Sequence, residues 1–123
     1  MLRSGTRKHR CTPAAPTNGQ PLFRLGSVYA TPAALALLEE HGVSGATLLV
    51  RHQCGDFGHL GADSIRDNRL AIERGGRIIS AYRLLSEDVL TRMTSSEQRR
   101  TPTAWIISEA DRSATTILLP DEY

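Results

Sequence analysis

The sequence predicts an α+β domain in which three N-terminal helices pack on a three-stranded antiparallel meander. The stretch 103–120 predicts two of the strands, because two runs rich in β-branched and aromatic residues flank the polar segment 109–113 in a hairpin pattern. A third apolar run, at 77–84, supplies the remaining strand. Upstream, three segments with helical spacing of apolar residues and capping residues at their ends predict the helices.

Length and charge predict one domain with a basic tail. The 123 residues are enough for a single modest core, and 40% hydrophobic with 5% aromatic residues fits a small α+β protein better than a β-sandwich. Four of the 15 Lys and Arg residues lie in 1–21, which holds no acid, so 11 basic and 13 acidic side chains remain. We expect a disordered tail at 1–21, a mildly acidic domain at 22–123, and nucleic-acid contact only through the tail.

The sequence also predicts a cytoplasmic protein without a membrane segment. No apolar run approaches the roughly 20 residues of a spanning helix, and no apolar signal region follows the basic N-terminal residues. The two cysteines, Cys11 and Cys54, do not make a disulfide framework, so we expect reduced thiols.

The first clear helix signal lies at 32–41. Thr31 supplies an N-cap hydroxyl directly before a proline at the first helical position, and Gly42 ends the helical pattern. The preceding stretch 22–29 is ambiguous: it is either a leading loop or an edge strand interrupted at Gly26.

Two further helices are expected at 45–54 and 62–74. Ser44 caps the first of them, and Gly55 stands where a left-handed residue ends a helix. The second begins near Asp63 or Ser64 and is closed by two consecutive glycines.

The connection 86–102 is long and mostly polar, as mobile or functional loops are, and its part 87–93 could form a helical turn. The expected core consists of Val43, Leu48, Leu49, Ile65, Ile72, Ile79, Trp105, Ile107, Ile117 and Leu119.

The densest group of reactive side chains lies at 52–59, with His52, Cys54, Asp56 and His59. Zinc accepts such donors, but the spacing matches no zinc pattern, because His52 and Cys54 diverge by about 200° on a helix. A structural role explains the same residues, since a histidine in the last turn interacts favourably with the helix C-terminus. We therefore expect no metal site and no cofactor.

A polar cleft formed by His52, Asp56 and Asn68 is the alternative to this structural reading. Its histidine could act in acid/base chemistry with Asp56 or Glu109, so these four residues are the candidate ligand site. No nucleophile elbow or phosphate-binding glycine loop occurs, so no catalytic residue is assigned. The charges around Arg112 in the hairpin turn are expected to be solvent-exposed and worth little as ion pairs.

Five stretches together resemble a protein family. They are TPAALALLEEHGVS at 31–44, GDFG at 55–58, Asn68, GGRIISAYRL at 75–84 and WIISEADRSATTILLPDEY at 105–123. The chain is similar over 22–123 to small uncharacterised bacterial proteins of plasmids and other mobile elements, labelled plasmid-related protein or, loosely, type I restriction subunit. The resemblance implies no activity. Phe57, where members more often have Trp, and the longer connection at 85–102 depart from the family.

The restriction label finds no support in the residues. A DNA methyltransferase needs a larger cofactor-binding domain and an Asn/Asp-Pro-Pro-Tyr/Phe motif. A nuclease of the PD-(D/E)xK type needs a lysine beyond its acids, and the chain's single lysine is Lys8. We expect neither activity.

The leading functional hypothesis is a non-enzymatic binding or regulatory accessory protein of a mobile genetic element that acts through a protein partner. It is expected to form a homodimer through a sheet edge or the uncovered sheet face, since a narrow sheet has two exposed edges. One alternative is a small enzyme or ligand-binding protein that uses the cleft around His52, Asp56 and Asn68. The other is weak nucleic-acid binding through the tail.

Overall fold

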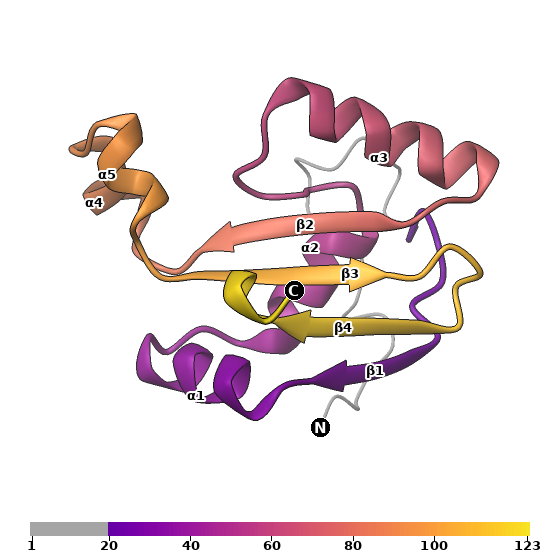
Figure 1. Ribbon diagram of the computed structural model, residues 1–123, viewed down its shortest axis with the longest axis horizontal. Helices are drawn as coiled ribbons and strands as arrows, with labels where there is room; N and C mark the ends of the chain where they lie inside the picture. The colour runs from indigo at the N-terminus through magenta and orange to yellow at the C-terminus, as the bar shows by residue number, and fades with distance from the viewer. Residues whose placement is uncertain (1–19) are drawn as a thin grey trace.

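The computed structural model describes residues 20–123, so most of the tail expected at 1–21 lies outside the described residues (Figure 1). The elements in chain order are β1 (Ser27–Ala30), α1 (Pro32–Glu40), α2 (Gly45–Gln53), α3 (Ala62–Arg74), β2 (Ile78–Arg83), α4 (Glu87–Thr91), α5 (Ser95–Arg99), β3 (Thr103–Ser108), β4 (Ala114–Leu118) and the 3₁₀ helix η2 (Pro120–Glu122). The strands form a four-stranded sheet in the order β1-β4-β3-β2. The α+β class is thus confirmed.

The expected three-stranded antiparallel meander is wrong. β2, β3 and β4 pair antiparallel as expected, but β1 adds a fourth strand parallel to β4, with Ser27 opposite Ala114 and Ala30 opposite Ile117. Gly26, which seemed to interrupt the stretch 22–29, has a φ of +67° and lies against backbone carbonyls of the β3–β4 turn, where a Cβ would overlap them. The glycine therefore lets the chain turn tightly into the strand.

The expected set of three helices is also incomplete. The connection 86–102 carries α4 and α5, where the sequence suggested a single helical turn. Thr94 caps α5 through a capping box with Glu97: Oγ1 of Thr94 accepts from the Glu97 amide at 3.1 Å, and Oε1 of Glu97 accepts from the Thr94 amide at 2.8 Å. Such local hydrogen bonds order a polar segment whose apolar pattern is too weak to reveal it.

The three N-terminal helices are confirmed to within one residue. Oγ1 of Thr31 accepts from the Ala34 amide at 3.1 Å, and Oγ of Ser44 accepts from the Thr47 amide at 3.3 Å, as the caps predict. The third helix starts at Ala62, one residue before Asp63, and its N-cap Gly61 provides no side-chain hydrogen bond.

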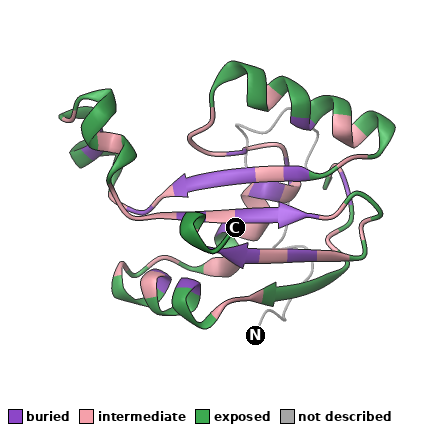
Figure 2. Cartoon of the chain, viewed as in Figure 1, coloured by how far each residue is buried: buried purple, intermediate pink, exposed green. Residues whose placement is uncertain are grey.

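The inner face of the sheet packs on α1 and α2 and forms the main core (Figures 1 and 2). Its buried residues are Ala34, Leu38, Leu48, Tyr82, Leu84, Ala104, Ile106 and Ile117. A second cluster joins Phe23, Phe57 and Ile78.

The expected core was right only in part. Leu48, Ile107 and Ile117 are buried, whereas Val43, Leu49, Ile65, Ile72, Ile79, Trp105 and Leu119 are half-buried. Ile78 and Ile106, which point to the opposite sheet face from the expected core residues Ile79 and Ile107, are completely buried. Apolar residues stand on both faces of β3, so alternation alone does not identify the inner face.

The free side of β2 is closed by other parts of the chain. The Ala81 amide donates to the Phe57 carbonyl at 3.1 Å, and the His59 amide donates to the Ala81 carbonyl at 2.6 Å. Between them, Gly58 has a φ of +79° and lies so close that a Cβ would overlap the Ala81 carbonyl. Glycine is therefore required here for its backbone and for its lack of a side chain.

The structure tests the expectations about a membrane segment and about the cysteines. No single helix among residues 20–123 is long and apolar enough to cross a membrane; α1 and α2 pass that test only as a pair bent by 105°. Cys54 is buried and is not a free thiol, so the expectation of a reduced thiol is wrong there, and Cys11 lies outside the described residues.

We predict that Gly58→Ala destabilises the fold more than Gly42→Ala. Gly42 also has a positive φ, of +64°, but has open space around it. Gly42→Ala should therefore lower the free energy of unfolding by about 1–2 kcal/mol for its left-handed backbone. Gly58→Ala adds the overlap with β2 and should lower it by about 1–3 kcal/mol more. Urea unfolding of both variants measures the difference, and equal losses would show that the close approach is unimportant.

Candidate functional site

The structure does not bring the four candidate residues His52, Asp56, Asn68 and Glu109 together. No hydrogen bond or ion pair between the described residues joins any two of them. Each is held by a separate set of partners, described in turn below.

His52 lies at the centre of a buried hydrogen-bond network, here called the His52 network. Its Nδ1 lies 2.6 Å from Ser80 Oγ and its Nε2 lies 3.0 Å from Ser108 Oγ. Ser108 Oγ lies 2.7 Å from Thr115 Oγ1, which donates to the Leu25 carbonyl at 2.7 Å. All four side chains are fully buried, so one imidazole ties α2 to three strands and to the segment before β1.

The last acceptor of the His52 network and the neutral form of the imidazole together set the direction of each proton. A carbonyl only accepts, so Thr115 donates to it, and Ser108 must then donate to Thr115. Ser108 accordingly accepts from Nε2–H of His52, whose Nδ1 accepts from Ser80. Each hydroxyl and each ring nitrogen thus has its partner with the imidazole neutral.

Burial holds the imidazole in that neutral form. Desolvation, with a smaller contribution from the nearby positive charge of Arg112, lowers the pKa of His52 to about 3. The rings of Phe23 and Phe57 lie edge-on to the imidazole, with centroids 5.2 and 6.4 Å away. His52 thus contacts two serine side chains, Ser80 and Ser108, but in the core, where no substrate reaches them.

Asp56 forms a local ion pair at the end of α2. Its Oδ2 accepts from Arg51 Nε at 2.7 Å and its Oδ1 accepts from the Gly58 amide at 3.3 Å. The Asp56 carbonyl accepts from Tyr82 Oη at 2.6 Å, and the Arg51 guanidinium lies 4.7 Å from the centroid of the Tyr82 ring. Burial raises the pKa of that phenol. The carboxylate therefore organises the turn into the GDFG segment.

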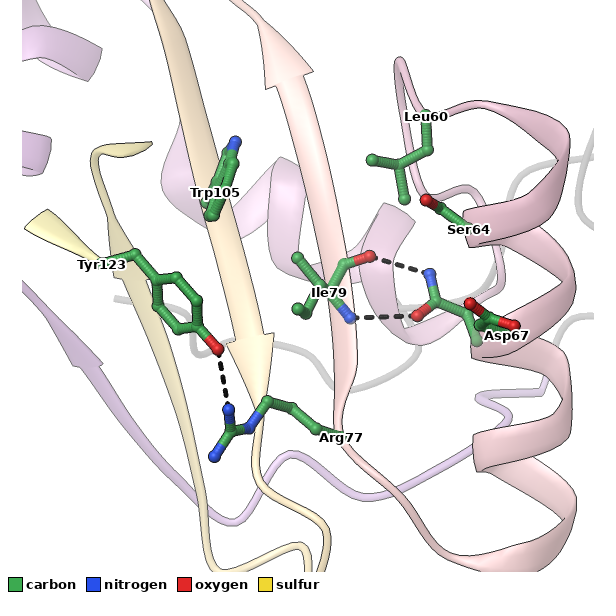
Figure 3. Close-up of a pocket in the computed structure, with 8 residues that line it drawn as sticks. Leu60, Ser64, Asp67, Arg77, Ile79, Trp105 and Tyr123 are labelled. Carbon is green, nitrogen blue, oxygen red and sulfur yellow. Dashed lines mark hydrogen bonds between the residues drawn. The ribbon is translucent and has the colours of Figure 1, made fainter. Parts of the chain in front are cut away.

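Asn68 substitutes for a neighbouring strand at the free side of β2. Its Nδ2 donates to the Ile79 carbonyl at 2.8 Å, and its Oδ1 accepts from the Ile79 amide at 3.1 Å (Figure 3). These two bonds fix α3 against the sheet. Glu109 lies far along the chain, in the β3–β4 turn, and forms an exposed pair with Arg77 at 3.4 Å.

Arg112 is the structural residue that sequence reasoning missed. Its Nη1 donates to the carbonyls of Gly76 and Glu109 at 2.7 and 2.9 Å, and its Nη2 donates to the Ala71 carbonyl at 3.0 Å. The guanidinium thus satisfies carbonyls at the C-terminal end of α3 and ties the hairpin turn to it. Because the carbonyls of Gly76 and Ala71 are 36 and 41 residues away in the sequence, no sequence pattern reveals this role.

A hollow of about 450 Å³ lies on the outer face of the sheet, between α3 and the C-terminus (Figure 3). It is lined by Leu60, Ser64, Asp67, Asn68, Arg77, Ile79, Trp105 and Tyr123, and is here called the outer trough. Sequence reasoning missed it because it treated Trp105 as a core residue. Trp105 is only half-buried because it lies on the outer face of β3, whereas α1 and α2 cover the inner face.

One wall of the outer trough is aromatic. The rings of Trp105 and Tyr123 lie 5.6 Å apart at 57°, and Arg77 Nη1 donates to Tyr123 Oη at 2.7 Å. Ile79 lies between this wall and α3, which contributes Ser64 and Asp67 (Figure 3).

The outer trough has the composition of a binding site. It combines aromatic and aliphatic surface with one carboxylate and one guanidinium. Within residues 20–123, no group of three or more His, Cys, Asp or Glu side chains is placed to hold a metal ion.

No family model, curated protein or solved structure matches the chain. The functional argument therefore rests on the geometry of these residues.

We predict that the fold loses stability as the pH falls below 6.5, because of His52. Between its ordinary pKa of 6.5 and its folded pKa of about 3, the imidazole is protonated only in the unfolded chain. The unfolded state then binds more protons, so the free energy of unfolding falls by about 1.4 kcal/mol per pH unit. Urea titrations at several pH values between about 7 and 5 measure this slope.

His52→Gln is the control, because its amide can hydrogen-bond to hydroxyls but does not titrate. The variant should be less stable at neutral pH and should lose the one-proton slope. The chosen window lies above the range of Asp111 and Glu122, whose pKa values are held low by hydrogen bonds from Ser113 and from the Leu119 amide. Equal slopes in both proteins would contradict a neutral buried imidazole.

Proposed function

We propose that the chain is a non-enzymatic binding protein that recognises a protein partner through the outer trough. The observation that carries the proposal is a contrast in accessibility. The His52 network, which holds the serine–histidine hydrogen bonds found within residues 20–123, is buried and neutral, whereas the outer trough presents aromatic surface to solvent.

The composition of the outer trough favours a peptide segment as its occupant. Trp and Tyr are enriched among residues that dominate binding energy, and Tyr123 is 62% exposed beside Trp105. An apolar side chain of the partner would lie on Ile79 against this wall. Flanking charges of the partner would then pair with Asp67 or Arg77 at the polar rim.

The biological setting is part of the same proposal. The resemblance over 22–123 supports a role as an accessory protein of a bacterial mobile genetic element, acting in the cytoplasm. The alternative cleft of His52, Asp56 and Asn68 is not favoured, because these side chains bond to different partners. Nucleic-acid binding through 1–21 stays a prediction, since nearly all of that segment lies outside the described residues.

Selection of peptides on the immobilised full chain tests the proposal, with a phage-displayed library of random peptides as the probe. Trp105 is the chain's single tryptophan, so its fluorescence reports directly on the outer trough. Selected peptides should contain an aromatic or aliphatic anchor and shift the emission to shorter wavelength. Ser64→Phe, which fills the outer trough from α3, should raise the Kd about tenfold or more.

Ser96→Phe is the matched control, because Ser96 is exposed in the first turn of α5 and does not line the outer trough. It should leave the Kd unchanged. Peptides that bind both variants equally well and leave the Trp105 emission unchanged would refute the outer trough as the binding site.

A further inference from the structure

The two edges of the sheet differ in how their backbone groups are satisfied. Along β2, both polar groups of Ile79 bond to Asn68, and both polar groups of Ala81 bond to Phe57 and His59. The Arg83 amide donates to His59 Nδ1 at 3.2 Å. This edge has no room for a further strand.

The opposite edge, β1, is open among the described residues. The amides of Ser27 and Thr31 donate to the Ser113 and Ile117 carbonyls of the β4 side, each at 3.0 Å. Since bonding direction alternates along a parallel strand, Val28 and Ala30 direct their N–H and C=O groups away from β4. Within residues 20–123, β1 pairs with β4 alone in the sheet order, so no other described strand bonds to these groups.

This edge is apolar, and β1 itself lacks the charged residues and prolines that protect many edge strands. The strand SVYA holds no charge and no proline, which in other proteins discourage a further strand. Val28 and Tyr29 are 46% and 58% exposed, and Leu35 of the adjoining α1 is 53% exposed. Figure 2 shows β1 at the border of the sheet, exposed except at its last residue. Three exposed large apolar side chains thus lie at β1 and α1.

We propose that β1 pairs antiparallel with β1 of a second copy, which joins two sheets across a twofold axis. In the register centred on Tyr29, Val28 exchanges both backbone hydrogen bonds with the partner subunit's Ala30, and the symmetry repeats the pair. Tyr29 then faces the partner subunit's Tyr29 at a non-hydrogen-bonded position, where Cα atoms approach to about 4.5 Å. Two tyrosine rings at this distance can pack in an offset arrangement.

A second copy suits this edge because the edge is self-complementary. Only Val28 and Ala30 offer outward groups, and the twofold axis matches those of one copy with those of the other and leaves none unpaired. Antiparallel pairing also lays the start of one β1 beside the end of the other. The exposed Arg24 precedes β1, and the Glu122 carboxylate accepts from Thr31 Oγ1 at its end at 2.7 Å, so the ends carry opposite charges.

Sedimentation equilibrium of the full chain tests the dimer. The wild type should show a concentration-dependent dimer, which Val28→Pro should abolish, because proline removes an outward N–H and no bond to β4. Tyr29→Lys, which sets like charges face to face, should also give a monomer and does not depend on tolerance of proline. Leu70→Ser, which removes an exposed apolar side chain on α3, should leave the dimer intact, as should Ser64→Phe in the outer trough.

Introduced thiols test the register. Under mild oxidation, Tyr29→Cys should form a disulfide-linked dimer beyond any wild-type background, and Val28→Cys should not, because Val28 faces Ala30 and not itself. A wild type that stays monomeric, a dimer that survives both Val28→Pro and Tyr29→Lys, or the reverse crosslinking pattern overturns the proposal. A dimer that forms only after deletion of residues 1–19 also overturns it, since the chain's own N-terminal segment would then occupy the edge.

Discussion

The structure depends on one neutral imidazole in its core. His52 comes from the end of a short helix and yet bonds to strands β2 and β3 and, through Ser108 and Thr115, to β4 and the Leu25 carbonyl. A buried polar group left without its partner costs about 1–3 kcal/mol, so each member of the network holds the others in register. This constraint specifies where α2 sits on the sheet in a way that aliphatic packing alone does not.

Hydrogen bonds from polar groups also close the β2 edge of the sheet. Asn68 binds the backbone of Ile79 as a strand would, and the glycine at 58 lets the chain approach Ala81 closely. Arg112 then ties the hairpin turn to the end of α3. These contacts use polar side chains from the middle of the sequence to stabilise the fold. Among residues 20–123, β1 is therefore the edge at which a further strand can pair.

The two surfaces proposed to bind partners are those that the helices leave uncovered. α1 and α2 occupy the inner face of the sheet, so the outer face between α3 and Tyr123 presents Trp105 and Ile79 in a hollow. The outer trough and the β1 edge are separate surfaces, and a dimer through β1 would carry one trough on each copy. A protein of this kind would offer two equivalent recognition sites to its partner.

The sequence by itself determined most of the local structure of this protein, although α4 and α5 were missed. Capping residues such as Thr31 and Ser44 and the period of the apolar residues placed three helices and the antiparallel strands β2, β3 and β4 to within a residue or so, because those signals act between near neighbours. Only the tertiary structure decided that β1 joins parallel to β4, which face of β3 is inner, and where His52, Asp56, Asn68 and Glu109 go. Each of these depends on contacts between residues far apart in the chain, and no local pattern encodes such contacts.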